Sequence, residues 1–491
     1  MPLYDCEMKV MALQPPSPPF MDVDRECAGG FGVGQPNSRS EYGHNQYPYY
    51  SIQLAHVAGA LVRDGYEVVF FDAQAEQCNQ DSVVDKVLSE APDIIVSVVN
   101  LPSLKADLDL LYEVRNALSG NVRIICIGSV CRVLFDEIIQ HKGIDFVITG
   151  APEVVIPIII ACREGKEHTV DGIVFKRENE TIVTTGAKVP KNLDYLPRIP
   201  YHLLPMDRYE MALFGEQNKF ATIVGSLGCP FDCGYYCPYP VGFGKHVRFR
   251  AVEEVVHEMS YLSKNYSVKD FVFRDQVFTL SKQRVFDICD RLIEHNLNIN
   301  WVCETRFDFA KDELMLNRMK EAGCRRIHFG LETGDRALFE NVAKPRAKFE
   351  DIEKVVNMLN RVGIDFHVHT IVGLPGETWD SVLNTATLLK ALNIYSINPS
   401  IIVPYPGTVF YKEAKERGWI STYDWEMYTS RHAVVRTEQM SIDEIVKAHK
   451  YLMNVFSIKN HQSPIDRAVD KAKEMIKKLL IKARIGESRS I

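Results

Sequence analysis

The sequence predicts an α/β protein with a doubly wound, Rossmann-like N-terminal domain, a partial (β/α)6 barrel and a helical C-terminal tail. Strand-like and helix-like segments alternate over the first 160 residues, which is typical of a parallel sheet covered by helices on both faces. About six further strand–helix units follow in order from Phe220, and such a series favours a barrel. We therefore expect domains at residues 1–162, 213–415 and 416–491, with a linker at 163–212.

Five parallel strands are expected in the N-terminal domain, and such sheets bind ligands at the carboxyl ends of their strands. The segment Pro15–Tyr50, rich in Pro, Gly and Asn, is unusually long for a loop in a compact domain. We expect it to lie over the ligand, and a helix at Ser51–Asp64 follows it. The five expected strands are Lys9–Gln14, Glu67–Asp72, Asp93–Val99, Arg123–Gly128 and Phe146–Thr149.

The polar linker contains a hairpin pattern at Asp171–Thr185 and several prolines. From Ser441 onward the pattern predicts two amphipathic helices, the second with a basic, solvated face. The barrel helices are expected at Val252–Asn265, Gln283–His295, Asp312–Ala322, Phe349–Val362 and Thr378–Leu392, and the barrel strands at Phe220–Val224, Asp270–Phe273, Asn300–Glu304, Arg326–Phe329, Phe366–Val372 and Ser396–Val403.

The composition narrows the class of protein. A net charge of −7 argues against a protein that holds nucleic acid through a basic surface. No apolar run approaches the roughly 20 residues that span a bilayer, and the first residues lack a signal-peptide pattern. We therefore expect a cytoplasmic protein without a membrane span. In that compartment the twelve cysteines indicate metal binding and scattered buried thiols rather than disulfides.

Three of the cysteines cluster in the sequence. Cys229, Cys233 and Cys237 lie within Ser226–Pro240, directly after the first expected barrel strand. Three thiolates can hold three irons of a [4Fe–4S] cluster and leave the fourth iron open to a small molecule. A structural zinc site is the alternative, and it needs a fourth ligand such as His246.

This segment resembles the cluster loop of the radical S-adenosylmethionine (SAM) superfamily, in which the open iron binds the amino and carboxylate groups of SAM. The usual spacing in the superfamily is Cys-x3-Cys-x2-Cys, whereas this chain has Cys-x3-Cys-x3-Cys. One extra residue therefore stands before the third cysteine. The resemblance implies that Tyr236, the aromatic residue next to that cysteine, contacts the adenine.

Motifs on the later strands resemble the same superfamily, one on each strand in order. Phe273–Thr279 is similar to the motif that receives the SAM amino group, Phe329–Gly334 to the ribose motif, and Ile371–Thr378 to the motif beside the adenine. Trp301–Arg306 and Pro404–Thr408 are similar to the third and sixth strands. The resemblance implies that SAM is bound by Tyr236, Asp275, Glu304, Glu332 and Gly373.

A doubly wound domain ahead of such a barrel resembles the cobalamin-binding subgroup of the superfamily, so residues 1–162 are expected to bind cobalamin. The chain lacks the Asp-x-His-x-x-Gly motif whose histidine ligates cobalt, and His44 and His56 stand alone. We therefore expect cobalamin to bind at the sheet edge without a histidine ligand. The alternative for Ser97 and Ser129 is that they only satisfy backbone groups at turns. The expected contacts, at strand ends, are Ser97, Asn100, Gly128, Ser129 and Glu153.

The resemblance implies an enzyme that methylates an unactivated carbon, a cobalamin-dependent radical SAM C-methyltransferase with a [4Fe–4S] cluster, SAM and cobalamin as cofactors. Some relatives in this subgroup catalyse cyclisation or rearrangement without net methyl transfer, which is the alternative. A non-catalytic cobalamin or SAM sensor is a third interpretation, and the complete cysteine set disfavours it. The expected partners are an external one-electron reductant, such as a flavodoxin or ferredoxin, and a substrate that is a small molecule or a protein residue.

Polar side chains inside the expected barrel are the candidates for catalysis. His367 and His369 alternate with apolar residues on the fifth strand, so both point to one side, where they could contact substrate or relay a proton. The alternative is a pair of hydrogen-bonded core histidines, and His328 is more typical of a structural residue. The four candidates are Arg306, His367, His369 and Tyr405.

Overall fold

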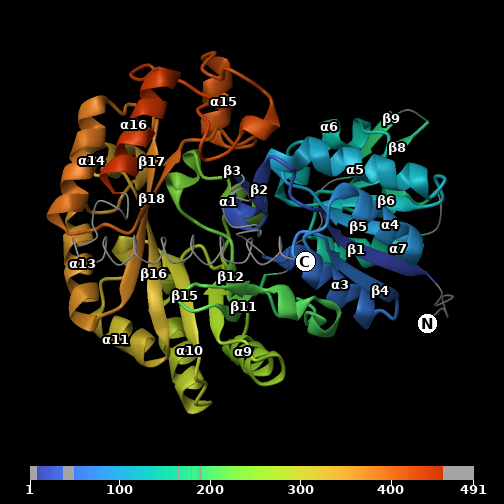
Figure 1. Cartoon of the computed structure of the whole chain (residues 1–491), viewed down its shortest axis with the longest axis horizontal. Helices are drawn as coiled ribbons and strands as arrows, with labels where there is room; N and C mark the ends of the chain where they lie inside the picture. Colours follow the sequence, from blue (N-terminus) through green and yellow to red (C-terminus); the bar gives the residue numbers. More distant parts are fainter. Residues whose placement is uncertain are drawn as a thin grey trace, which may run out of the picture.

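A computed structural model describes residues 8–36, 49–162, 165–178, 180–184, 186 and 191–456. These residues form two α/β halves that lie side by side, an N-terminal sheet with its helices and a larger open barrel (Figure 1). The predicted fold class is confirmed. Strands and helices alternate along most of the chain because the apolar positions repeat with the periods of those two structures.

Among the described residues, seven strands form the N-terminal sheet, in the order β4-β1-β5-β6-β7-β8-β9. The first five run parallel, and their side chains are buried on both faces. The hairpin β8–β9 pairs antiparallel with β7, so it extends this sheet rather than forming part of a linker. The strands are β1 (Lys9–Gln14), β4 (Glu67–Asp72), β5 (Ile94–Val98), β6 (Arg123–Ile127), β7 (Phe146–Ile148), β8 (Ile173–Arg177) and β9 (Glu180–Val183).

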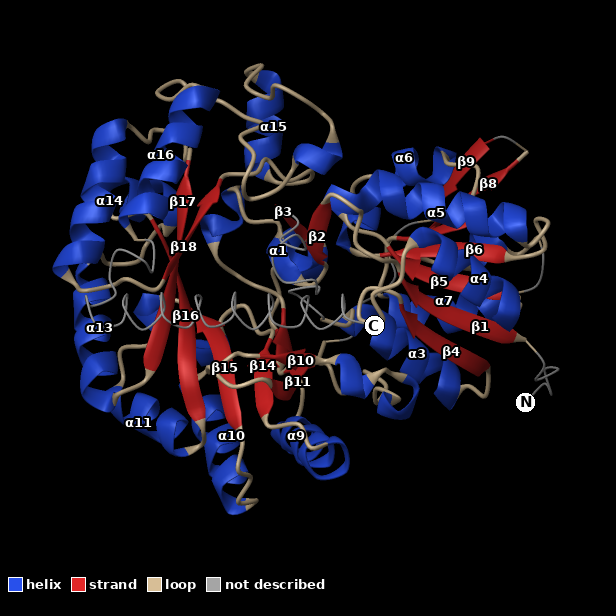
Figure 2. Cartoon of the chain, viewed as in Figure 1, coloured by secondary structure: helices blue, strands red, loops and turns tan. Residues whose placement is uncertain are grey.

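Helices cover both faces of this sheet (Figure 2). One face packs against the apolar sides of α3 and α7, and the opposite face against α4, α5 and α6. Ser51 caps the start of α3, and its side chain accepts a hydrogen bond from the amide of Leu54. The helices are α3 (Ile52–Arg63), α4 (Gln80–Glu90), α5 (Leu104–Ala117), α6 (Phe135–Gln140) and α7 (Pro152–Ala161).

The second half is an open barrel whose described strands have the order β10-β11-β14-β15-β16-β17-β18. The strands from β11 to β18 run parallel, and β10 pairs antiparallel with β11. Val224, Arg274 and Glu304, at the carboxyl ends of β11, β14 and β15, line a cavity together with residues of the N-terminal half. The strands are β10 (Glu210–Met211), β11 (Asn218–Ile223), β14 (Asp270–Phe273), β15 (Asn300–Thr305), β16 (Cys324–Glu332), β17 (Asp365–Val372) and β18 (Ile397–Ile401), and a small ribbon pairs β12 (Ser226–Leu227) with β13 (Arg248–Phe249).

The outer face of the barrel sheet carries its helices (Figure 1). Of the two predicted tail helices, the first is α16, and the second falls outside the described residues. No helix in the described part of the chain is both long enough and apolar enough to cross a membrane. The helices are α8 (Tyr239–Phe243), α9 (Val252–Tyr266), α10 (Lys282–Glu294), α11 (Glu313–Glu321), α12 (Arg336–Leu338), α13 (Glu350–Val362), α14 (Trp379–Ala391), α15 (Val409–Glu416) and α16 (Ile442–Val455).

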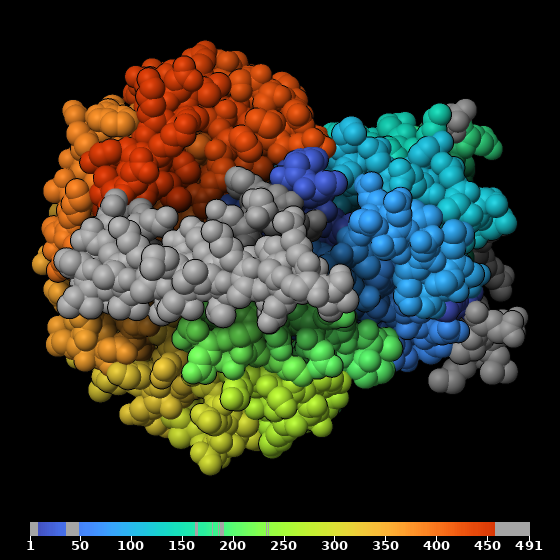
Figure 3. All heavy atoms as spheres, in the orientation of Figure 1, coloured from blue at the N-terminus to red at the C-terminus, as the bar shows by residue number. Residues whose placement is uncertain are grey.

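The segment predicted as one long loop contains regular structure. It forms a ribbon of β2 (Met21–Asp24) and β3 (Val33–Pro36), with the short helical segment α1 (Cys27–Gly30) between them. Figure 3 shows part of this segment in dark blue at the junction of the two halves. It covers the carboxyl edge of the N-terminal sheet. The remainder of the predicted loop, residues 37–48, lies outside the described residues.

A buried ion pair attaches this segment to the sheet. The guanidinium of Arg25 donates to both carboxylate oxygens of Asp107 on α5, at 3.0 and 2.9 Å. It also donates to the side chain of Asn100 and to the carbonyl oxygens of Pro15 and Pro16. Both charged side chains are essentially inaccessible to solvent, at 0% and 1% exposure. A buried charge needs such compensation, so this pair holds the segment in place.

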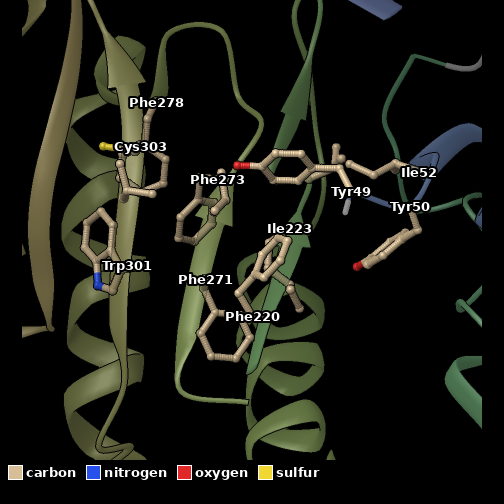
Figure 4. Packing of buried hydrophobic residues seen from close by; sticks show 14 of the residues in the cluster. Tyr49, Tyr50, Ile52, Phe220, Ile223, Phe271, Phe273, Phe278, Trp301 and Cys303 are labelled. Atoms are coloured by element: carbon tan, nitrogen blue, oxygen red, sulfur yellow. The ribbon is translucent and has the colours of Figure 1, made fainter. Parts of the chain in front are cut away.

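Aromatic residues join the two halves. Tyr49 packs edge-on against Phe220 of β11, with ring centroids 5.1 Å apart, and the hydroxyl of Tyr50 donates to the carbonyl of Thr222 at 3.0 Å. Figure 4 shows Tyr49 and Tyr50 beside the first strands of the barrel, next to Phe220 and Phe273. The apolar core is therefore continuous from the N-terminal sheet into the barrel.

Replacing Asp107 by Ala leaves the buried Arg25 without its counter-charge, and breaking a buried pair in this way costs about 3 to 5 kcal/mol. We expect a clear fall in the urea midpoint of unfolding. Asp109→Ala is the matched control, because Asp109 lies on the same helix, is half exposed and pairs only with surface groups. Equal midpoints for the two variants would contradict the role assigned to the Arg25 pair.

Candidate active site

The loop that carries the clustered cysteines is held at its start and at its end. It leaves β11 at Gly225, whose amide donates to Asp275 at 2.7 Å, and the hydroxyl of Ser226 donates to the same carboxylate at 2.6 Å. Further along, the amide of Cys229 donates to the carbonyl of Gly244 at 3.0 Å. Asp275, predicted to receive the SAM amino group, therefore also positions the loop. Burial raises the pKa of its carboxyl.

The three cysteines are close enough to influence one another. Cys229 and Cys233 are buried, and the amide of Cys237 donates to the carbonyl of Cys233 at 3.0 Å. Burial raises the pKa of the Cys237 thiol, and Cys233 and Cys229 raise it further. Among the described residues, no three His, Cys, Asp or Glu side chains already surround a common metal position. The fit to an iron–sulfur cluster therefore depends on the donor chemistry, three thiols on one short loop.

Positive side chains lie beside these thiols. Lys344 and Arg306 both lower the pKa of Cys229, against the larger effect of its burial. Arg306 donates to Asp308 through two nitrogens at 2.9 Å, and its guanidinium lies over the ring of Phe231, 4.1 Å from the centroid. Its Nη1 is buried without a hydrogen-bond partner in the described part of the chain. Such a free donor beside the cluster loop suits a ligand carboxylate.

Glu332, predicted to bind ribose, lies in the same region. Its carboxylate pairs with Lys344 at 2.7 Å, and both side chains are about nine-tenths buried. Burial by itself lowers the pKa of Lys344, but the charges of Glu332 and Cys233 outweigh it and raise the pKa. Glu332 has a φ of +67°, an unusual value for a residue with a side chain, at an irregularity in the pairing of β16 with β17. Strain of this kind is typical of ligand sites.

Of the remaining predicted SAM contacts, Tyr236 lies near this point. Tyr236 is buried, and its hydroxyl donates to the carbonyl of Ala343 at 3.2 Å, next to Lys344. Gly373 follows β17 with a φ of +94°, and its amide donates to the carboxyl of Glu377, whose pKa burial raises to about 8. The structure thus brings Tyr236, Glu332 and the cysteine loop together.

The predicted catalytic histidines form a group with His328 on the paired strands β16 and β17. The rings of His367 and His369 have centroids 4.9 Å apart, and His328 lies 5.1 and 5.6 Å from them. Burial lowers the pKa of His367 to about 3, with His369 contributing, and lowers that of His328 well below its usual value. These two rings are therefore neutral at pH 7. Tyr405 lies elsewhere, edge-on to Phe31 of the N-terminal segment at 5.6 Å.

A cavity of about 360 Å³ lies between the two halves. Glu304 and Tyr239 line its barrel end, and Tyr239 follows the third cysteine by two positions. The hydroxyl of Tyr239 is buried and has no hydrogen-bond partner among the described residues. Arg132 and Glu153 line the opposite end, at the carboxyl edge of the N-terminal sheet. The cavity therefore connects the cysteine loop with the predicted cobalamin edge.

Of the five predicted cobalamin contacts, only Glu153 lines this cavity. Asn100 donates to the carbonyls of Arg25 and Gly30, and the hydroxyl of Ser129 donates to that of Gly29. These two residues therefore hold the α1 segment, as the alternative for Ser129 expects, and their contact with cobalamin stays a prediction. The reason is that α1 covers the strand ends. Ser97 is fully buried within β5, and Gly128 packs against the backbone of Val99.

The sequence did not indicate the residues that α1 brings to the cavity. Cys27 donates to Asp24 at 2.9 Å and accepts from Arg274 at 3.8 Å. Burial, followed by the charge of Asp24, raises the pKa of this thiol well above its usual value, so the sulfur stays protonated. Burial also raises the pKa of Glu26 to about 7, although Arg274 opposes this. No spacing rule links residues 24–27 to Arg274, so only the folded chain brings them together.

Comparison with known proteins identifies the barrel. Residues 223–389 match the family model described as the radical SAM superfamily, so this part of the chain is a radical SAM domain. The match implies a [4Fe–4S] cluster and SAM, as the sequence predicted.

An uncharacterized methyltransferase of Pyrococcus horikoshii is 28% identical over 399 residues, which are 80% of this chain and 84% of that protein. The anaerobic magnesium-protoporphyrin IX monomethyl ester cyclase of Rubrivivax gelatinosus is 24% identical over 405 residues, 80% and 71% of the two chains.

The whole chain is similar in structure to the cobalamin-dependent S-adenosylmethionine radical enzyme OxsB in its apo form. The TM-score is 0.69 at 15% sequence identity, and the match covers 96% of this chain and 70% of OxsB. This likeness confirms the predicted arrangement of a doubly wound sheet followed by a partial barrel. The predicted resemblance to the radical SAM superfamily is confirmed as well.

Replacing Cys233 by Ala removes one of the three thiols that would hold the cluster. We expect anaerobic reconstitution with iron and sulfide to leave this variant with little bound iron, because two thiolates hold a [4Fe–4S] cluster poorly. Iron content and visible absorbance measure the result. Cys162→Ala, at the end of α7, is the matched control and should keep its iron. Full iron in Cys233→Ala would show that these cysteines are not the ligands.

Replacing Glu26 by Gln tests the carboxyl at the cavity wall. In the folded protein the pKa of Glu26 is about 7, above its usual value of 4.5. The stability of the wild type therefore falls as the pH rises from 4.5 through 7. The amide has no proton to lose, so the variant should gain thermal stability relative to wild type between pH 5 and pH 8. Glu253→Gln, at an exposed site, should show no such trend. If the difference in stability between Glu26→Gln and wild type is the same at pH 5 and at pH 8, the pKa of Glu26 is not raised.

Proposed function

Because residues 223–389 form a radical SAM domain within the fold of a cobalamin-dependent enzyme, we propose that this protein is a cobalamin-dependent radical SAM C-methyltransferase acting on an unactivated carbon. The cavity between the two halves carries the proposal. It is lined by Tyr239 next to the cluster loop and by Arg132 and Glu153 at the sheet edge. A substrate in this cavity would lie between the SAM site and the N-terminal half.

The cluster and SAM each have a set of side chains suited to them. Cys229, Cys233 and Cys237 would hold the cluster, and Tyr236 and Glu332 would contact SAM. When bound, the cluster and SAM supply a radical that abstracts hydrogen from carbon, and cobalamin supplies the methyl group. An external one-electron reductant of the flavodoxin or ferredoxin class would supply the electron.

The chain's own residues orient the reactants and exclude water. Lys344 and Arg306 place positive charge beside the thiolates, which stabilises them in a site of low dielectric. The free hydroxyl of Tyr239 can donate a hydrogen bond to a substrate oxygen or nitrogen in the cavity. Val224, Leu227 and Phe243 give part of the wall an apolar surface. Such a wall keeps water away from a reactive carbon.

We infer that cobalamin binding moves the α1 segment, because this segment covers the strand ends where the sequence predicts the corrinoid. The backbone of α1 is attached to the sheet edge through the side chains of Asn100 and Ser129. We infer that these hydrogen bonds break on binding, while the buried pair of Arg25 and Asp107 keeps the base of the segment in place. The released Asn100 and Ser129 would then face the corrinoid, as the sequence predicted.

A cobalamin-dependent radical SAM cyclase without net methyl transfer is the second candidate. It is favoured by the relative from Rubrivivax gelatinosus, which is named a cyclase and aligns over 80% of this chain. The two candidates differ in their products. Methyl transfer converts SAM to S-adenosylhomocysteine, whereas cyclisation does not.

The test uses full-length protein reconstituted anaerobically with iron, sulfide and hydroxocobalamin. It is then given a reductant, methyl-labelled SAM and a cell extract. We expect S-adenosylhomocysteine and transfer of label to a small molecule or to a protein band, and no SAM cleavage by Cys233→Ala. Product formation without label or S-adenosylhomocysteine would favour the cyclase. SAM cleavage that persists in Cys233→Ala would overturn the assignment as a radical SAM enzyme.

A further inference from the structure

The cavity between the halves is positively charged, although the chain as a whole carries a net charge of −7. Five basic side chains line it against three carboxylates, Glu26, Glu153 and Glu304. An excess of two positive charges at a concave, partly buried site attracts anions. The basic residues are Arg132, Lys191, Lys245, Arg248 and Arg274.

Two of these residues approach each other from different halves. Arg132 follows β6 of the N-terminal sheet, and Arg248 lies on β13, directly after the cluster loop. Each donates one Nη2 to a backbone carbonyl, Arg132 to Gly150 at 3.1 Å and Arg248 to Phe243 at 3.2 Å. Arg248 is only 9% exposed. Arg248 also interacts with the hydroxyl of Tyr195, and in the described part of the chain neither guanidinium is hydrogen-bonded to a carboxylate.

The nearby acid does not neutralise both cations. Glu153 is buried, and it accepts a hydrogen bond from the hydroxyl of Tyr195 at 2.8 Å. Burial lowers the pKa of Arg132, and the charge of Arg248 lowers it further, while Glu153 opposes both effects. One carboxylate thus lies near two guanidiniums without forming a hydrogen-bonded pair with either. Burying an uncompensated charge is costly, so the arrangement suits a ligand that brings a second negative charge.

We propose that Arg132 and Arg248 together form a binding site for an oxyanion, a phosphodiester or a carboxylate, at the sheet end of the cavity. Guanidinium groups recognise such anions through paired, charge-assisted hydrogen bonds. The first residues of α7 line the same end, and the N-terminus of that helix adds positive potential. The anion has two sources, the phosphodiester of the cobalamin nucleotide loop or an anionic group on the substrate. The first source rests on the proposed function.

The first arm of the test compares hydroxocobalamin with cobinamide, which lacks the nucleotide loop and its phosphodiester. Dissociation constants are measured by equilibrium dialysis for full-length wild type, Arg132→Gln and Arg248→Gln, with Arg291→Gln on the surface of α10 as the control. If the phosphodiester binds here, each cavity variant loses cobalamin affinity at least about tenfold but keeps its affinity for cobinamide. The variants Arg132→Lys and Arg248→Lys keep the charge and should recover part of the loss.

The second arm uses inorganic phosphate and needs no corrinoid. Millimolar phosphate, compared with chloride at equal ionic strength, should raise the melting temperature of wild type and Arg291→Gln but not of the two cavity variants. If phosphate gives this result, and the cavity variants lose affinity for both corrinoids equally or for neither, the anion belongs to the substrate. Phosphate stabilisation without any corrinoid binding would contradict cobalamin use and leave the anion site intact. If neither arm distinguishes the cavity variants from Arg291→Gln, the site does not exist.

Discussion

The buried ion pair between Arg25 and Asp107 is the interaction on which the site depends. It attaches the segment before α1 to the N-terminal sheet, because a guanidinium with almost no solvent contact must keep its carboxylate and its carbonyl acceptors. The segment in turn places Glu26 and Cys27 against Arg274 of the barrel. The cavity wall thus combines residues from both halves, and loss of this one pair would change the wall as well as the stability.

The cysteine loop likewise depends on buried side chains of opposite charge. Thiolates in a buried loop need positive neighbours, and two separate segments supply them. Arg306 directly follows β15, and Lys344 follows the helical turn Phe339–Ala343. Lys344 is shared with Glu332, so the groups expected to bind ribose and those that stabilise the cluster loop form one electrostatic unit. The unusual backbone of Glu332 is maintained within this unit. A substitution at Lys344 should therefore affect SAM and the cluster together.

The α1 segment gives the two halves a common boundary. In the structure it covers the strand ends of the N-terminal sheet and at the same time lines the cavity. Its glycines allow close packing, since a side chain at Gly29 would collide with the backbone of Tyr239 and one at Gly30 with Ser129. The segment is therefore shaped to contact both the sheet and the first helix after the cluster loop. Movement at this boundary would open the sheet edge toward the SAM site.

By itself, the sequence determined the fold class, most strands and helices, and the cysteine loop, because these depend on periodicity and on residues close in the chain. The tertiary structure decided the rest. Asn100 and Ser129 sit at strand ends as predicted, yet they bind α1, since burial there depends on residues about 70 to 100 positions earlier. Arg132 and Arg248 line one cavity, and Arg274 donates to Cys27, although each of these pairs comes from distant segments. No local pattern indicates which distant charges will meet in a cavity.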